Sequence, residues 1–269
     1  MEIFQAFVLG AVQGLSEFLP ISSSGHLVIV PWLFSWRDPG LGFDVALHWG
    51  TLFGVVAYFW QDIILIIKGF WHSLFKQSRD LQNNIYQKLS WFLIIASIPG
   101  AIIGKLLEQQ AESVFRNPFL IALTLGGFGL VLWLADFYGK KTKNLDKISW
   151  THSVLIGLSQ ALAIIPGVSR SGSTMAAGLG LGFKRADAAR FSFLMSIPII
   201  FGAGLVKIGE FTNGVSSVEL IVGFLSAAVF GFLAVKYLLR FLTKNNFNIF
   251  VWYRLALAAL ILVVYFGRM

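Results

Sequence analysis

Six long apolar stretches constrain what this chain can fold into. A helix needs about 20 mostly apolar residues to cross the hydrocarbon core of a membrane. We predict crossings at residues 43–60, 89–104, 118–135, 188–206, 218–235 and 249–266. The sequence therefore predicts an all-α integral membrane protein with about six transmembrane helices.

The composition supports this class and excludes others. Of the 269 residues, 57% are apolar and 13% are charged, against about 45–50% and about 25% in soluble domains. So little polar surface could not cover a water-soluble globule, which argues against a soluble enzyme, a disordered protein or a nucleic-acid partner despite the net charge of +8. The absence of cysteine excludes disulfides and thiolate chemistry. The start of the chain lacks the basic segment of a cleavable signal peptide. We expect a single polytopic domain over 1–269.

Two shorter apolar stretches, 3–19 and 153–165, differ from the six crossings. Each runs into a polar segment rich in Ser, Pro and Gly, at 20–26 and 166–172. Thirteen helical residues rise about 20 Å, which is less than a hydrocarbon core of about 30 Å. Such broken backbone is tolerated at membrane depth only inside protein or beside a cavity. We therefore predict two re-entrant segments.

The two re-entrant segments also resemble each other. The residues at 14–17, Gly-Leu-Ser-Glu, match Gly-Leu-Ser-Gln at 157–160, and Ser-Ser-Ser-Gly at 22–25 matches Ser-Arg-Ser-Gly at 169–172. Three predicted crossings follow each segment, and an odd number inverts the second half. We predict an inverted repeat, with halves at 1–136 and 150–269, of the type known in transporters.

The basic residues indicate an orientation. If the loop after the first crossing is cytoplasmic, most of the 21 Lys and Arg residues lie on that side, as the positive-inside rule requires. The predicted cytoplasmic set is Lys68, Lys76, Arg79, Lys88, Lys140, Lys141, Lys143, Lys147, Lys184, Arg185, Arg190, Arg240 and Lys244. The basic excess thus reflects topology.

Three ionisable residues inside the predicted membrane region are candidate functional groups, since charges are costly there. Glu17 shares a helix face with Gln13, and its carboxylate could hold a divalent cation, accept a proton or only pair with Arg170. Arg170 follows the Pro-Gly break at the start of a predicted helix. Helix starts and guanidinium groups both bind phosphate oxygens, and Ser169, Ser171 and Thr174 add hydroxyl donors.

The third candidate, His26, lies in the first polar segment with Ser22 and Ser23. A serine near a histidine could act as a nucleophile with its base, or the histidine could protonate a leaving oxygen; a serine-rich loop with an incidental histidine is the alternative. The remaining histidines, His48, His72 and His152, are expected to be interfacial or packing residues.

With these residues in view, the chain resembles the undecaprenyl-diphosphate phosphatase family, the bacitracin-resistance membrane proteins of bacteria. Gln13 and Glu17 match its Glu/Gln-xxx-Glu motif, and 20–26 match its Pro-x-Ser-Ser-x-x-His element. Residues 166–174 match its Pro-Gly-x-Ser-Arg-Ser-x-x-Thr motif in full. Many members have Glu at the position of Gln13, so this chain has one carboxylate where the family often has two.

The resemblance implies hydrolysis of undecaprenyl diphosphate to undecaprenyl phosphate and inorganic phosphate, which recycles the carrier lipid for peptidoglycan synthesis and gives bacitracin resistance. It also implies Mg²⁺ or Ca²⁺ as a cofactor, held by Glu17 and Gln13. It further implies a bacterial inner-membrane location, a site facing the outer or periplasmic side, and a homodimer. Ser22, Ser169, Arg170, Ser171 and Thr174 would bind phosphate oxygens, and Ser23 is the candidate nucleophile, with His26 or Glu17 accepting its proton.

Two other classes fit parts of the pattern. The type-2 phosphatidic-acid phosphatases share Ser-Gly-His and Ser-Arg elements, but their second histidine would stand where this chain has Ala176. A secondary transporter or flippase of a phosphate-bearing lipid would share the inverted repeat. Fold alone does not separate binding from hydrolysis; a serine and a histidine beside Arg170 favour hydrolysis.

Overall fold

The computed structural model describes residues 2–75, 85–211 and 214–269. The regular secondary structure of these residues is helical, with no strand in the described ranges. Six helices are long and apolar enough to cross a membrane, as predicted. They are α3 (Leu41–Tyr58), α5 (Ile85–Leu106), α7 (Pro118–Tyr138), α10 (Arg185–Lys207), α11 (Ser217–Leu242) and α12 (Asn248–Gly267). Many of their large apolar side chains are exposed, as a lipid-facing surface requires; Trp252 and Val263 are examples.

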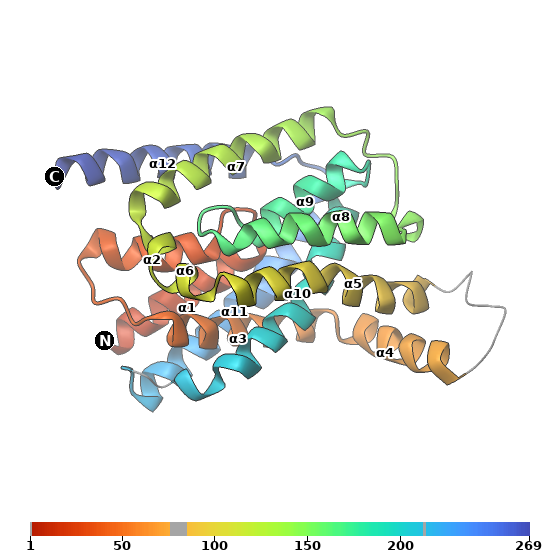
Figure 1. Ribbon diagram of the computed structural model, residues 1–269, viewed down its shortest axis with the longest axis horizontal. Helices are drawn as coiled ribbons and strands as arrows, with labels where there is room; N and C mark the ends of the chain where they lie inside the picture. Colours follow the sequence, from red (N-terminus) through yellow and green to blue (C-terminus); the bar gives the residue numbers. More distant parts are fainter. Residues whose placement is uncertain (1, 76–84, 212–213) are drawn as a thin grey trace.

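Two pairs of shorter helices occupy the interior. The first pair is α1 (Ile3–Phe18) and α2 (Ser23–Phe34), and the second is α8 (Trp150–Ala161) and α9 (Arg170–Gly180), with the 3₁₀ turn Leu162–Ile164 after α8. In Figure 1 each pair enters the bundle and turns back, the first from the end that holds both termini and the second from the opposite end. The first pair is interrupted around Pro20 and the second around Pro166 and Gly167, since Pro lacks the N–H that a helix interior needs. Pro31 nonetheless lies within α2.

Small residues let the short helices lie close to the long ones. α1 packs on α11, where a Cβ on Gly10 would fall 2.3 Å from the carbonyl oxygen of Gly223. α8 packs on α5 in the same manner, and a Cβ on Gly157 would lie 2.5 Å from the carbonyl oxygen of Ala96. α1 of the predicted first repeat therefore packs on α11 of the second, and α8 of the second packs on α5 of the first. An inverted repeat would show such a reciprocal pairing; the repeat itself remains a prediction.

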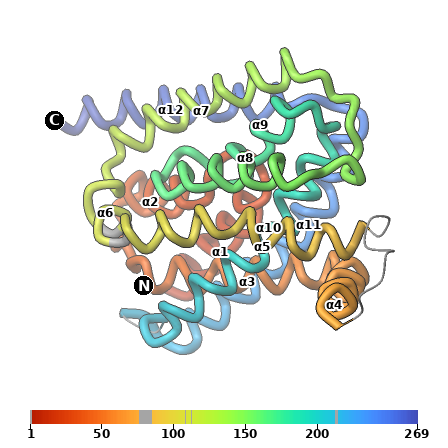
Figure 2. The backbone as a smooth tube through the Cα atoms, turned by 45° about the vertical axis from the view of Figure 1, so that its right-hand side comes forward, coloured from red at the N-terminus to blue at the C-terminus, as the bar shows by residue number. Residues whose placement is uncertain are grey.

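An amphipathic helix, α4 (Trp60–Phe75), follows the first crossing and was not among the predicted elements. Figure 2 shows that α4 projects from the bundle at the end opposite the chain termini. Asp62 at its start accepts a hydrogen bond from Arg190 of α10. Its 16 residues are fewer than the about 20 that a crossing needs, and Asp62, Lys68 and His72 interrupt its apolar residues, so the hydropathy pattern did not identify it.

Short elements and ion pairs close the two ends of the bundle. α6 (Glu108–Glu112) and the 3₁₀ turn Val114–Arg116 join α5 to α7, while the turns Leu145–Lys147 and Ile208–Glu210 follow α7 and α10. Asp136 at the end of α7 binds Arg185 Nε at 2.6 Å and accepts the backbone N–H of Phe247 before α12. This carboxylate ties three helices together at the end opposite the chain termini.

The basic residues gather at one end of the bundle. The loops after α3, α7, α9 and α11 lie at the end opposite both termini (Figure 1). The described members of the predicted cytoplasmic set lie in these loops, in α4 or in the helix ends beside the loops. Lys76 and Arg79, which belong to the same prediction, lie outside the described residues. We call this end of the molecule the basic end.

Candidate active site

The broken tips of the two short helix pairs meet inside the bundle. The backbone N–H of Gly167 donates to Ser22 Oγ at 2.9 Å, and Ser171 Oγ donates to the carbonyl oxygen of Leu19 at 2.9 Å. Residues 145 or more positions apart thus become neighbours. The candidate residues from both sequence motifs are brought to this junction.

Two serines at the tips share an unusual backbone conformation. Ser22 has φ of 73° and Ser169 has φ of 75°, in a region that side chains other than glycine rarely adopt. Each hydroxyl accepts the backbone N–H three residues on, from Gly25 and Gly172, and so caps α2 and α9. Strain of this kind costs on the order of 1–3 kcal/mol and concentrates at functional sites. Ser22 and Ser169, which occupy matching positions in the two similar sequence segments, thus also share their backbone conformation and capping role.

Glu17 lies at the centre of a buried polar cluster. Its Oε2 accepts hydrogen bonds from Ser23 Oγ at 2.6 Å and from Gln13 Nε2 at 3.0 Å. Its Oε1 pairs with Arg170 Nη2 at 2.7 Å. The carboxylate is 5% exposed, so these partners replace water as its hydrogen-bond donors.

Arg170 is held at the first turn of α9 with donors to spare. Besides the bond to Glu17, its Nη1 donates to the carbonyl oxygen of Ser192 on α10 at 2.9 Å. A guanidinium carries five N–H donors, and these two bonds leave others for an anion. Arg170 is the first residue of α9. One residue thus brings together the two phosphate-binding features that the sequence suggested, a guanidinium group and a helix start.

His26 is oriented by a different set of partners. Its Nδ1 donates to the carbonyl oxygen of Ser22 at 2.7 Å, and its Nε2 lies 2.7 Å from the Tyr253 hydroxyl, whose ring stacks on the imidazole. Both ring nitrogens are therefore engaged away from Ser23. Of the two proton acceptors considered for Ser23, Glu17 is the one that lies within hydrogen-bond distance.

The remaining hydroxyls predicted to bind phosphate are engaged inside the protein. Ser169 Oγ lies 3.2 Å from Ser171 Oγ, and Thr174 Oγ1 lies 2.7 Å from Ser192 Oγ. Ser22 and Ser171 join the two tips, as described above. These four side chains shape the junction around Arg170, and direct contact of their hydroxyls with phosphate stays a prediction.

His48 belongs to the cluster, and the expectation that it is only an interfacial or packing residue is wrong. Its Nδ1 donates to the carbonyl oxygen of Asp44 one turn earlier in α3, and its Nε2 lies 3.3 Å from Glu17 Oε2. Its side chain is 25% exposed. Nothing near His48 in the sequence marks it, because its partner comes from another helix.

Arg254 is the second functional candidate that the sequence analysis missed. It is fully buried in α12. Its guanidinium donates to five backbone carbonyl oxygens, which belong to Pro20, Thr124, Leu125, Gly167 and Val168. It therefore joins both tips to α7. A charged residue within the apolar stretch 249–266 was the signal that could have identified it, because such residues are functional candidates by default.

Comparison with known proteins decides the family. The model of the bacitracin resistance protein BacA matches residues 6–260. The chain belongs to the BacA family. It is 55% identical over 269 residues to a protein of Moorella thermoacetica named undecaprenyl-diphosphatase, with full coverage of both chains. Proteins with the same name from Pelotomaculum thermopropionicum and Desulforudis audaxviator are 49% and 48% identical; the matches cover 100% and 98% of this chain and 98% of each relative.

The BacA chain offers oxygen atoms for the predicted divalent cation, but few of them. No group of three or more His, Cys, Asp or Glu side chains that could hold a metal occurs in the described part of the chain. Glu17 supplies one carboxylate, and Gln13 Oε1 is buried without a hydrogen-bond partner. Hard cations such as Mg²⁺ take oxygen ligands and often keep waters or substrate phosphates. Because Gln13 presents Nε2 to Glu17, its amide would have to turn over to offer Oε1 to the same cation, and the cation stays a prediction.

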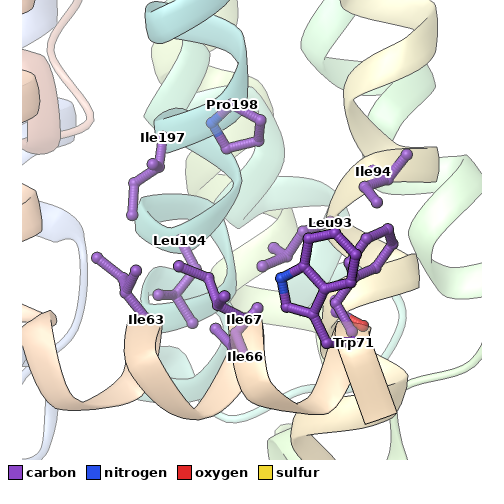
Figure 3. A pocket seen from close by; sticks show the side chains of 11 residues that line it. Ile63, Ile66, Ile67, Trp71, Leu93, Ile94, Leu194, Ile197 and Pro198 are labelled. Atoms are coloured by element: carbon purple, nitrogen blue, oxygen red, sulfur yellow. The ribbon is translucent and has the colours of Figure 1, made fainter. Parts of the chain in front are cut away.

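An apolar cavity of about 360 Å³ lies apart from this cluster, between α4, α5 and α10. Figure 3 shows Ile63 and Trp71 from α4, Leu93 from α5 and Leu194 from α10 around it. Leu194 lines the cavity, while Ser192, two residues earlier in α10, contacts Arg170. Residues two apart lie on different faces of a helix, so the cavity and the site lie on different faces of α10. The cavity suits a hydrocarbon chain but does not adjoin the polar groups of the site.

Proposed function

We propose that this multi-pass membrane protein hydrolyses undecaprenyl diphosphate to undecaprenyl phosphate and inorganic phosphate. The relatives named undecaprenyl-diphosphatase, at about half identity over the whole chain, support this activity. The observation that carries the proposal is the contact between Ser23, Glu17 and Arg170. A hydroxyl 2.6 Å from a carboxylate that is itself paired with a guanidinium combines a nucleophile, a proton acceptor and an anion-binding group.

In the proposed reaction Arg170 binds oxygens of the terminal phosphate. Phosphoryl transfer depends mainly on positioning and charge stabilisation, which a guanidinium fixed at a helix start provides. Ser23 Oγ attacks the terminal phosphorus while its proton moves to Glu17 Oε2, and the bond to the prenyl-phosphate oxygen breaks. Water then releases inorganic phosphate from Ser23. Direct attack by water, with Glu17 as base, would use the same groups.

A divalent cation held by Glu17 and Gln13 would neutralise charge on the diphosphate. Gln13 Nε2 faces Glu17, and Gln13 Oε1 has no hydrogen-bond partner among the described residues. Turning the amide over would bring this oxygen beside the carboxylate. Because one carboxylate and one amide bind a hard cation weakly on their own, we expect the substrate to complete the ligand set.

We also propose that the basic end is cytoplasmic and that the site opens toward the opposite, outer side. The positive-inside rule supports the orientation. A line of polar groups that leads from Glu17 toward the start of α3 supports the opening. His48 lies next to Glu17, and Asp44 lies one turn earlier in α3. Arg116 binds both Asp44 and Asp38, just before α3. Association into a homodimer stays a prediction from the family resemblance.

The test is phosphate release from a C55 prenyl diphosphate by the purified protein in detergent. We expect release with Mg²⁺ or Ca²⁺, little release with EDTA, and a loss of about 100-fold or more for Arg170→Ala, the scale of losing a key charge-stabilising donor. Arg37→Ala, which changes an exposed arginine, is the matched control. Equal rates for Arg170→Ala and the parent would refute the site; no release by folded parent protein would refute the activity and favour lipid binding or transport.

A further inference from the structure

A second cavity lies in the half of the bundle toward the basic end and reaches the inner end of α1 at Leu15 and Leu19. Its volume is about 790 Å³. One part of its wall is formed by Leu15 and Leu19. The other part is formed by α11 from Leu233 onward and by the start of α12 at Ile249. We call it the α11–α12 groove.

The wall of this groove is apolar and its rim is basic. Arg240 and Lys244 lie four residues apart at the end of α11 and line the groove together with Asn245. Both charged side chains are exposed. In the proposed orientation, lipid headgroups would lie near this rim.

The two rim cations have no carboxylate partner within residues 2–75, 85–211 and 214–269. Two arginines at the same end do have one: Arg185 binds Asp136 and Arg190 binds Asp62. A pair of unneutralised cations beside an apolar groove is complementary to a phosphate group that carries a hydrocarbon chain. It is a poor match for a zwitterionic headgroup, whose own cation would face the same two charges.

The length of the groove agrees with a lipid of one leaflet. From Leu233 to the end of α11 at Leu242 the helix rises about 14 Å, and half of a hydrocarbon core is about 15 Å. A chain that runs from Arg240 to Leu15 would therefore span one leaflet and end near mid-membrane, next to the inner end of α1.

We propose that the α11–α12 groove binds an anionic phospholipid of the leaflet at the basic end. The lipid phosphate lies against Arg240 and Lys244, and an acyl chain fills the groove as far as Leu15 and Leu19. Basic pockets between transmembrane helices on the cytoplasmic side bind anionic headgroups in this way. The proposal does not depend on the hydrolytic activity, because neither cation belongs to the Glu17 cluster.

The test measures phospholipid retained by the purified protein, by native mass spectrometry in neutral detergent during titration with dioleoylphosphatidylglycerol or dioleoylphosphatidylcholine. We expect the parent protein to retain phosphatidylglycerol at least about fivefold more tightly than phosphatidylcholine. The double variant Arg240→Gln/Lys244→Gln should lose this preference. The matched control, Lys68→Gln/Lys140→Gln, removes two exposed cations elsewhere at the same end and should keep it.

A third variant separates the groove from its charged rim. Leu233→Trp fills the apolar wall and leaves both cations in place, so it should weaken retention of phosphatidylglycerol as strongly as the double variant does. Equal retention of the two phospholipids by the parent would overturn the proposal. So would an unchanged preference in the double variant, or retention of C55 prenyl monophosphate with no retention of phosphatidylglycerol.

Discussion

Glu17 Oε2 receives three neighbours from three different helices or turns: Ser23, Gln13 and His48. The Glu17 carboxylate orients the Ser23 hydroxyl through a hydrogen bond and, in the proposed reaction, accepts its proton. The Ser23 and Gln13 distances are those of ordinary hydrogen bonds. The roles of single residues in the cluster can therefore be separated by conservative changes.

Replacing Ser23 by alanine distinguishes the two routes for phosphate release. If Ser23 is the nucleophile, Ser23→Ala should lower the rate by about 100-fold or more, because the covalent route has no substitute for the missing oxygen. Rapid-quench mass spectrometry of the parent with substrate should then detect a phosphorylated Ser23. Ser24→Ala is the control, since the Ser24 hydroxyl contacts Ser22 and not Glu17. A near-parent rate for Ser23→Ala would exclude the covalent route.

Arg254 should matter for activity through the position of the tips. Arg254→Lys keeps the positive charge, but one ammonium group cannot reach carbonyl oxygens from three segments. We expect phosphate release to fall at least about tenfold while the protein remains folded, as judged by gel filtration and a thermal melt. Arg254→Met should melt at a lower temperature still, because it leaves several buried carbonyl groups unsatisfied. Parent-like kcat and KM in Arg254→Lys would contradict this positioning role.

At the scale of elements, close helix contacts fix where the reactive groups lie. Gly10, Gln13, Gly14 and Glu17 follow i, i+3, i+4, i+7 spacing and so share one side of α1. The two glycines on this side meet α11. Moving α1 away from α11 would therefore move Glu17 relative to Arg170. The same element provides the site and its own anchoring surface.

Adding one methyl group to α1 tests this coupling. In Gly10→Ala the new Cβ would meet the Gly223 carbonyl oxygen at 2.3 Å, so the helices must separate. We expect a lower melting temperature and a loss of phosphate release, despite the gain of about 1 kcal/mol in helix propensity. Gly127→Ala on α7 is the matched control, because a Cβ there meets nothing within 4 Å; it should be neutral or stabilising. A Gly10→Ala protein with parent stability and activity would show that α1 tolerates a shift.

At the scale of the whole molecule, the orientation in the membrane can be read directly. The chain has no cysteine, so single cysteines can be introduced without background. Met269→Cys at the end that holds both termini should react with a membrane-impermeant maleimide added to intact cells. Lys140→Cys at the basic end should react only after the membrane is opened. The reverse pattern would place the basic end outside and would contradict the proposed orientation.

Several features were predictable because they follow from local chemistry. Apolar runs predicted the six long helices, Pro20 marked the first break, and Pro166 and Gly167 marked the second. Glu17 and Arg170 were identifiable because a charge in an apolar setting is costly. α4 was not predictable from hydropathy, since an amphipathic helix at the membrane surface has a mixed pattern. His48 was missed because its role depends on a contact with another helix.

The sequence by itself determined that the chain belongs in a membrane, which residues carry charge within it, and that two motifs with phosphate-binding character stand far apart in the chain. Only the tertiary structure decided that these motifs meet, that Ser23 faces Glu17 and not His26, and that Arg254 joins both tips. The physical reason is that burial and helix breaking depend on a residue and its neighbours in the chain. Hydrogen-bond partners across the bundle depend instead on how whole helices pack, and no local pattern encodes that packing.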